Sequence, residues 1–189
     1  GRFLFKEQMT EHSFTADDQE FCRRCGVSRH LSEDDPDIRR LGCRPTWAKS
    51  WMDVAQIVSL RSYDRRLRVG TVIVSADNTQ VLSVGYNGNF RGGPHQHESL
   101  EPGKSGFIHA EVNALVKCNY GFHKPKHMYI THSPCKDCAK LILNADIARL
   151  VYGVKYRDSA GIDLLESCGL EVLSFEEADA LERQTKLYL

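Results

Sequence analysis

The sequence predicts an α/β fold, in which a β-sheet carries helices on its faces. Two observations support this. After Pro45, short β-branched apolar runs alternate with stretches whose apolar residues recur at helical spacing. Between the first two apolar runs, residues 75–78 read Ser-Ala-Asp-Asn, a turn sequence typical of a β-hairpin. Internal repeats and low-complexity tracts are absent from the sequence.

The predicted elements follow one another along the chain. A helix begins at Trp47, with Thr46 as its N-cap, and runs toward Arg66. Its inward face is expected to carry Trp51, Val54, Ala55, Val58 and Leu60. Strands are predicted at 69–74, 81–85, 128–131, 150–153 and 172–175. Further helices are predicted at 109–118, 135–144, 162–168 and 176–188.

A long segment, residues 87–106, separates the hairpin from the next helix and is rich in Gly, His and Pro. Loops of this length are uncommon in compact domains unless they have a function. We therefore expect this segment to contribute to a site.

Composition limits the kind of protein. The 189 residues suffice for one packed domain with an accessory segment. Lys and Arg together number 25, as do Asp and Glu, so the formal net charge is zero. Binding to nucleic acid through the charge of the whole chain is therefore not favoured. The apolar runs are too short to span a bilayer and the N-terminus lacks a signal-peptide pattern, so we expect a cytoplasmic protein with no membrane partner.

The chain is predicted to divide near Pro45 into a segment, residues 1–45, and a main domain, residues 46–189. The segment is polar, with an acidic run at residues 33–37, and could not bury much of a core unaided. A structural metal would supply the missing order.

Four residues of this segment could hold a structural zinc ion. They are His12, Cys22, Cys25 and Cys43. His30 could replace His12, and His95 or His97 could complete a site that joins the two regions. The alternative is that these cysteines are unligated surface residues.

The strongest functional signal is His109-Ala110-Glu111 followed by Pro134-Cys135-Lys136-Asp137-Cys138. His109, Cys135 and Cys138 could hold a catalytic zinc ion and leave a fourth position for water. Glu111 could then move protons as the catalytic acid and base. This order, H-x-E and then P-C-x-x-C, is a known signature of zinc-dependent nucleobase deaminases. A closed structural site, in which Glu111 could be the fourth ligand, is the alternative.

His109 and Cys135 each stand at the start of a predicted helix. The partial positive charge of a helix N-terminus lowers the pKa of a cysteine and favours a thiolate. Two further cysteines, Cys118 and Cys168, fall outside the metal patterns, and we expect both to be buried thiols.

From about residue 47 to residue 173, the chain resembles the deoxycytidylate (dCMP) deaminase family of the cytidine deaminase superfamily. The segments that carry the resemblance are 69–74, 85–88, 109–115, 133–142 and 152–158. The resemblance implies a cytidine-deaminase-like mixed sheet flanked by helices. It also implies zinc-dependent hydrolysis of dCMP to dUMP and ammonia, and a homo-oligomer.

The resemblance further implies that Asn87 contacts the sugar or base, that the backbone around Ala110 binds the pyrimidine carbonyl, and that Ser133 lies near the exocyclic amine. Without the family resemblance, Asn87 is equally well explained as a turn residue, because Asn-Gly favours positive φ. Candidate phosphate-binding cations are Arg66, Arg68, Lys155 and Arg157, with Tyr156 as a hydroxyl donor.

Two other functions fit the same residues. A deaminase that acts on cytosine in single-stranded DNA or RNA would use the same zinc chemistry, so the motif cannot separate it from a nucleotide enzyme. A non-catalytic, zinc-stabilised binding module would not need the carboxylate of Glu111, which is present.

Overall fold

The computed structural model describes residues 45–99, 101, 104–119 and 124–185. Within this range, residues 47–180 form one compact unit. The predicted N-terminal zinc ligands, His12, Cys22, Cys25 and Cys43, lie outside the described residues. Among the helices that are described, none is both long and apolar enough to cross a membrane.

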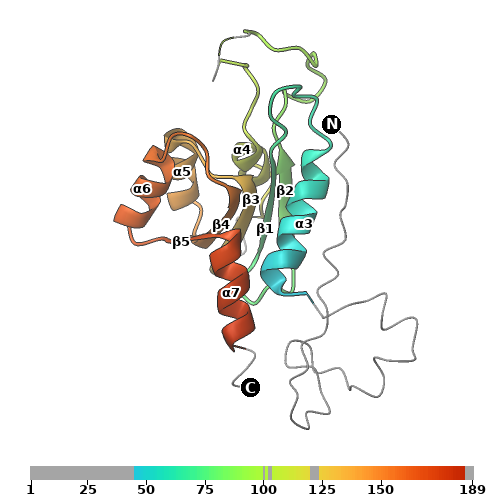
Figure 1. The fold of residues 1–189 in the computed structure, drawn as a ribbon. Coiled ribbons are helices and arrows are strands. Elements are labelled where there is room, and N and C mark those ends of the chain that lie inside the picture. Colours follow the sequence, from blue (N-terminus) through green and yellow to red (C-terminus); the bar gives the residue numbers. More distant parts are fainter. Residues whose placement is uncertain (1–44, 100, 102–103, 120–123, 186–189) are drawn as a thin grey trace, which may run out of the picture. The chain divides into compact units, whose positions relative to one another are not determined.

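Helices and strands alternate in the predicted order, with their ends shifted (Figure 1). The strands are β1 (Gly70–Ser75), β2 (Val81–Tyr86), β3 (Lys126–His132), β4 (Ile147–Val154) and β5 (Glu171–Ser174). The helices are α3 (Trp47–Ser59), α4 (Ala110–Leu115), α5 (Lys136–Leu143), α6 (Ala160–Ser167) and α7 (Phe175–Thr185).

The five strands form one mixed sheet in the order β2-β1-β3-β4-β5, which confirms the predicted fold class. The hairpin is also confirmed, since β1 pairs antiparallel with β2, and Asn78 in its turn has a φ of 61°. β1 also pairs antiparallel with β3, whereas β3, β4 and β5 run parallel. The carboxyl ends of β3 and β4 therefore lie at the same edge of the sheet, where α/β proteins commonly bind ligands.

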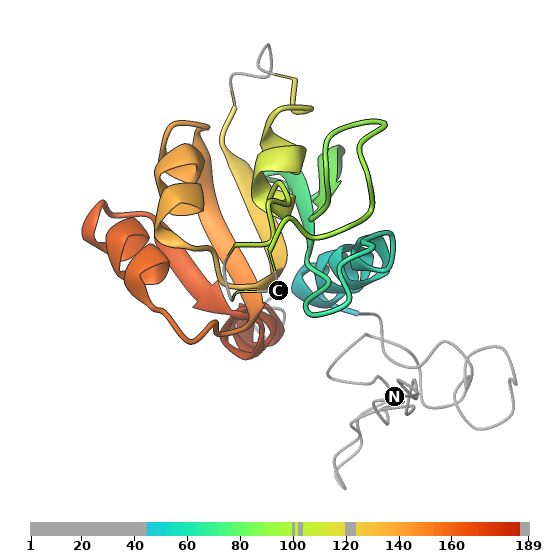
Figure 2. The same ribbon diagram turned by 90° about the horizontal axis from the view of Figure 1, so that it is seen from above.

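Helices cover both faces of this sheet (Figure 2). Successive strand residues point to opposite faces. Accordingly, Met128 and Ile130 pack with α4, α5 and α6, whereas Tyr129 between them packs with α3 and with Ala178 of α7. Both clusters consist of buried apolar side chains, so the sheet is the middle of three layers.

The first predicted helix is too long and its predicted inward face is partly wrong. α3 ends at Ser59, whose hydroxyl donates to the carbonyl of Gln56 at 2.6 Å, and the next two residues make only tight-turn hydrogen bonds. Leu60 therefore falls beyond the helix and is 65% exposed. The helix instead buries Ala48, Met52, Ala55 and Ser59.

The two unassigned cysteines differ in their surroundings. Cys118 is buried, as predicted, and packs in the core on the α4 side of the sheet. The prediction for Cys168 is wrong, because this residue is exposed. It is the C-cap of α6, where Gly169 turns the chain at a φ of 80°, and Leu165 and Leu170 enter the core instead.

Gly85 on β2 allows α4 to approach the sheet closely. A Cβ atom at this position would collide with the backbone of Ala110 and Ala114. We expect Gly85→Ala to lower the free energy of unfolding by about 1–3 kcal/mol, the usual cost of overpacking. Urea unfolding measures this cost. Gly88→Ala is the control, since its Cβ would meet only the Tyr86 ring at ordinary contact distance. Equal stability of the two variants would contradict this account.

Candidate metal centre and active site

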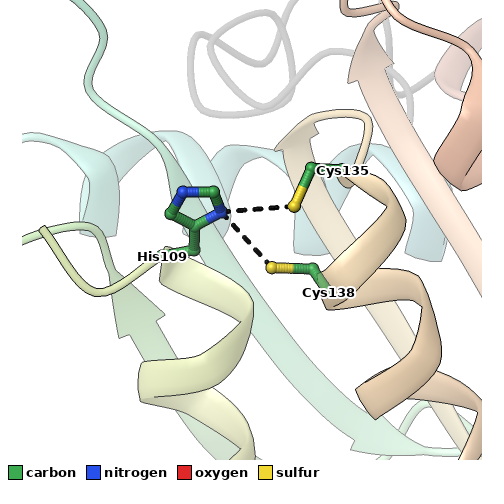
Figure 3. Close-up of side chains that lie close together, drawn as sticks. All are labelled: His109, Cys135 and Cys138. Atoms are coloured by element: carbon green, nitrogen blue, oxygen red, sulfur yellow. Dashed lines mark hydrogen bonds between the residues drawn. The ribbon is translucent and has the colours of Figure 1, made fainter. Parts of the chain in front are cut away.

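Two helices direct potential metal ligands toward one point (Figure 3). His109 is the N-cap of α4 and Cys135 is the N-cap of α5, and both have extended backbones with no capping hydrogen bond from the side chain. Cys138 follows on the first turn of α5. These side chains are thus available to face one another rather than to cap their own helices.

The three side chains fit a zinc ion by their chemistry and spacing. Their ligand atoms all lie within 4.8 Å of one another. Nδ1 of His109 is 3.6 Å from Sγ of Cys135 and 3.3 Å from Sγ of Cys138. In a tetrahedral zinc site with usual bond lengths, a nitrogen and a sulfur ligand are about 3.6 Å apart. Among the described residues, no fourth His, Cys, Asp or Glu side chain belongs to this group.

Electrostatics in the cluster favour a negative charge on sulfur. Hydrogen bonds from Cys138 and His109 lower the pKa of the Cys135 thiol to about 4. The same interaction with Cys135 raises the pKa of Cys138, and burial raises it further. The pKa of His109 is also raised, chiefly by its hydrogen bond to Cys135. A bound dication would act on both sulfurs and favour two thiolates.

Glu111 lies on the first turn of α4, two residues beyond His109, and is only 4% exposed. Burial raises the pKa of its carboxyl from the ordinary value. A buried carboxyl with a raised pKa, beside a candidate metal centre, is suited to accept and return protons.

A cavity of about 800 Å³ opens beside these residues. His109, Glu111, Cys135 and Cys138 line it. Five residues for which a substrate contact was predicted also line it, namely Asn87, Ala110, Ser133, Tyr156 and Arg157. The structure therefore brings together residues from four separate segments of the sequence.

The candidate phosphate-binding cations fall into two groups. Arg66 and Arg157 line the cavity, whereas Arg68 and Lys155 do not. The Arg66 guanidinium donates to the carbonyl oxygens of Ser99 at 2.9 Å and Glu101 at 3.3 Å. Arg157 is exposed, and its guanidinium lies 5.6 Å from the centre of the Tyr156 ring. Arg157 is thus the better placed of the two to bind a ligand.

Ser133 links the segment that carries Tyr156 and Arg157 to the end of β3. The backbone N–H of Tyr156 donates to Oγ of Ser133 at 2.8 Å, and the N–H of Ser133 donates to the carbonyl of Val154 at 2.9 Å. These bonds hold the segment that carries Tyr156 and Arg157 against the α5 end of the cavity.

Sequence reasoning missed several residues that line the cavity, among them Asp64, Phe107 and His132. His132 is the last residue of β3 and shares a face with Met128 and Ile130, so strand periodicity could have found it. Asp64 offers only a weak signal, a single acid in the polar turn before a buried strand. The His95 ring, considered as a zinc ligand, stacks against Tyr63 with ring centres 3.8 Å apart, and the His97 ring packs at a tilt against Phe107 with ring centres 4.9 Å apart.

Comparison with known proteins gives a consistent result. Residues 45–154 match the family model for the cytidine and deoxycytidylate deaminase zinc-binding region, and this range contains all three candidate ligands. ComE operon protein 2 of Bacillus subtilis (strain 168) is 32% identical over 141 residues, which are 70% of this chain and 73% of that protein. Deoxycytidylate deaminase of Homo sapiens is 33% identical over 122 residues, which are 60% of this chain and 68% of that protein.

A solved structure shares both sequence and fold with the chain. The dCMP deaminase from the cyanophage S-TIM5, in complex with dCMP and dUMP, is 33% identical with a TM-score of 0.61. The match covers 69% of this chain and 98% of that protein.

Proposed function

Because the chain belongs to the cytidine and deoxycytidylate deaminase family, we propose that it hydrolyses dCMP to dUMP and ammonia. One observation carries the proposal: a zinc-type ligand set and a buried carboxylate line the same cavity as the predicted nucleotide contacts. The name of the human relative and the ligands of the cyanophage structure support dCMP as the substrate.

His109, Cys135 and Cys138 would hold the zinc ion, which lowers the pKa of a coordinated water and so supplies a nucleophile at neutral pH. Glu111 accepts a proton from the attacking water and delivers it to N3 of the pyrimidine ring. Glu111 then takes the proton of the new hydroxyl on C4 and passes it to the exocyclic nitrogen, so the C4 carbonyl forms as the bond from C4 to that nitrogen breaks and ammonia leaves. Ala110 and Ser133, which line the cavity, orient the base for this sequence.

Substrate choice is tested by ammonia release from deoxycytidine, dCMP, dCTP and a cytosine-containing single strand. We expect dCMP to have the highest kcat/KM. Activity on the single strand alone would contradict the nucleotide proposal and support a nucleic-acid deaminase. Absence of activity on every substrate by the zinc-loaded protein would instead support a binding module.

Arg157 is expected to bind the 5′-phosphate. Removing one charge-assisted contact by Arg157→Ala should raise KM for dCMP about 10- to 100-fold, since such hydrogen bonds contribute about 1.5–3 kcal/mol. Activity on deoxycytidine, which has no phosphate, should not change. Lys155→Ala is the matched control, because Lys155 is exposed and does not line the cavity. Equal losses on dCMP and deoxycytidine would contradict phosphate recognition by Arg157.

A second zinc ion is proposed for the N-terminal segment, on the ligand chemistry of His12, Cys22, Cys25 and Cys43. Metal analysis of the full chain should then find about two zinc ions, one in each ligand set. Cys22→Ser should lower the count by one. A single zinc ion that is lost in Cys135→Ser would contradict the second site.

Homo-oligomerisation is also proposed. β2 is an edge strand of the sheet, and Val81 and Val84 on it are 49% and 38% exposed. Val116, just beyond α4, is 66% exposed. Exposed apolar side chains at a sheet edge are typical of surfaces that pair with another chain. Light scattering of the full chain should give a mass above 21.4 kDa, the mass of one chain.

A further inference from the structure

Asp64 is a buried carboxylate that lies outside the candidate metal centre and that the deamination steps above do not use. It follows α3, lines the cavity and is only 6% exposed. Oδ1 accepts hydrogen bonds from the backbone N–H groups of Arg66 at 2.8 Å and Leu67 at 3.2 Å. A carboxylate is costly to bury unless its oxygens are hydrogen-bonded, and these two bonds satisfy only one of them.

The second oxygen of Asp64 binds Asn87. Nδ2 of Asn87 donates one hydrogen to Oδ2 of Asp64 at 3.1 Å and the other to the carbonyl of Leu67 at 2.8 Å. Oδ1 of Asn87 accepts from the N–H of Val69 at 2.8 Å. An amide has two hydrogens to donate and can accept two. Within the described part of the chain, these contacts leave one acceptor position on Oδ1 for a ligand.

The orientation of the Asn87 amide is determined by these partners. Exchanging its oxygen and nitrogen would set Nδ2 against the N–H of Val69. It would also set Oδ1 against Oδ2 of Asp64 and the carbonyl of Leu67, so all three hydrogen bonds would be lost. The backbone is held as well, since the Ser62 hydroxyl donates to the Asn87 carbonyl at 2.8 Å.

The segment between β2 and α4 also approaches the carboxylate of Asp64, through His97. Nε2 of His97 lies 3.1 Å from Oδ1 of Asp64, although the two are not aligned as a hydrogen bond. The His97 ring packs at a tilt on Phe107, another residue that lines the cavity. Asp64 is thus close to two side chains of the segment between β2 and α4, those of Asn87 and His97.

We propose that Asp64 is a positioning residue that fixes the Asn87 side chain as a hydrogen-bond acceptor for the 3′-hydroxyl of the substrate. This inference rests on the proposed deamination of dCMP. A molecule of dCMP with an ionised phosphate has two kinds of donor, the 4-amine and the 3′-hydroxyl. The amine is the leaving group and must lie beside Glu111. The 3′-hydroxyl is therefore the donor left for Asn87.

The test compares dCMP with 2′,3′-dideoxycytidine monophosphate, which lacks only the 3′-hydroxyl. The wild-type kcat/KM should be about 10- to 100-fold higher for dCMP, since the analogue leaves the Asn87 oxygen without its donor. Asp64→Asn brings an NH₂ group against either Nδ2 of Asn87 or the N–H groups of Arg66 and Leu67, so this preference should fall at least about fivefold. Asp163→Asn, at an exposed position on α6, should keep the wild-type preference.

A purely structural role for Asp64 would lower activity on both nucleotides equally. A wild-type preference retained in Asp64→Asn would therefore overturn the proposal, as would a wild-type protein that does not distinguish the two nucleotides. In both cases dCMP deamination itself would stand. Inactivity of the zinc-loaded wild-type protein on dCMP would instead overturn the proposed function.

A second measurement covers the case in which Asp64→Asn does not fold or the wild-type protein is inactive. Side-chain amide NMR signals of Asn87, assigned by their loss in Asn87→Ala, should exchange with water at least about tenfold more slowly than those of exposed Asn144. Both Nδ2 hydrogens are bonded inside the protein, which is the reason for this protection. Equal exchange rates would overturn the positioning role.

Discussion

Glu111→Gln is expected to lower kcat for dCMP about 10²- to 10⁴-fold, the usual contribution of a catalytic acid and base. Glutamine keeps the size of the buried side chain but cannot take a proton from water and return it. Steady-state ammonia release measures this loss. Glu166→Gln is the matched control, because Glu166 is an exposed residue of α6.

The zinc content of Glu111→Gln separates two roles. Glu111 does not belong to the group of candidate ligands, so the variant should keep its catalytic zinc ion. Loss of zinc together with activity would mean that Glu111 is a fourth ligand and that the site is structural. Activity that survives with zinc in place would contradict its role in proton transfer.

Cys135→Ser is expected to abolish deamination and to remove one zinc ion per chain. A serine hydroxyl is a far poorer ligand for zinc than a thiolate, and two protein ligands would remain. Metal analysis, and activity measured before and after chelation and zinc addition, check this result. Added zinc should restore the chelated wild-type protein but not the variant.

Cys168→Ser is the matched control for this experiment, because Cys168 is an exposed thiol outside the cluster. It should keep both its zinc and its activity. An active Cys135→Ser protein with wild-type zinc content would contradict the assignment of the catalytic ligands.

The candidate metal centre could be predicted because its residue types and their order form a specific motif, although His109 lies 26 residues before Cys135. Cys135 and Cys138 are one helical turn apart, and the N-caps of two short helices bring His109 to them. The hairpin was predictable for the same reason, since its turn residues are specific to that backbone shape.

Other features have no such motif in the sequence. The hydrogen bond between Asp64 and Asn87 spans 23 residues, and neither side chain alone identifies the other as its partner. α3 ends at Ser59, whose hydroxyl donates to the carbonyl of Gln56, and the helical spacing of the apolar residues did not reveal this end. Cys168 is exposed because the chain turns at Gly169. Hydrophobic periodicity alone could not predict that turn.

Deamination by this chain would replace the exocyclic amine of dCMP with oxygen from water. It is tested most directly by incubating the zinc-loaded protein with dCMP in water enriched in oxygen-18 and analysing the nucleotide by mass spectrometry. We expect dUMP that carries the heavy isotope on C4, with one ammonia released for each dUMP formed. Unchanged dCMP, or dUMP without the isotope on C4, would contradict it.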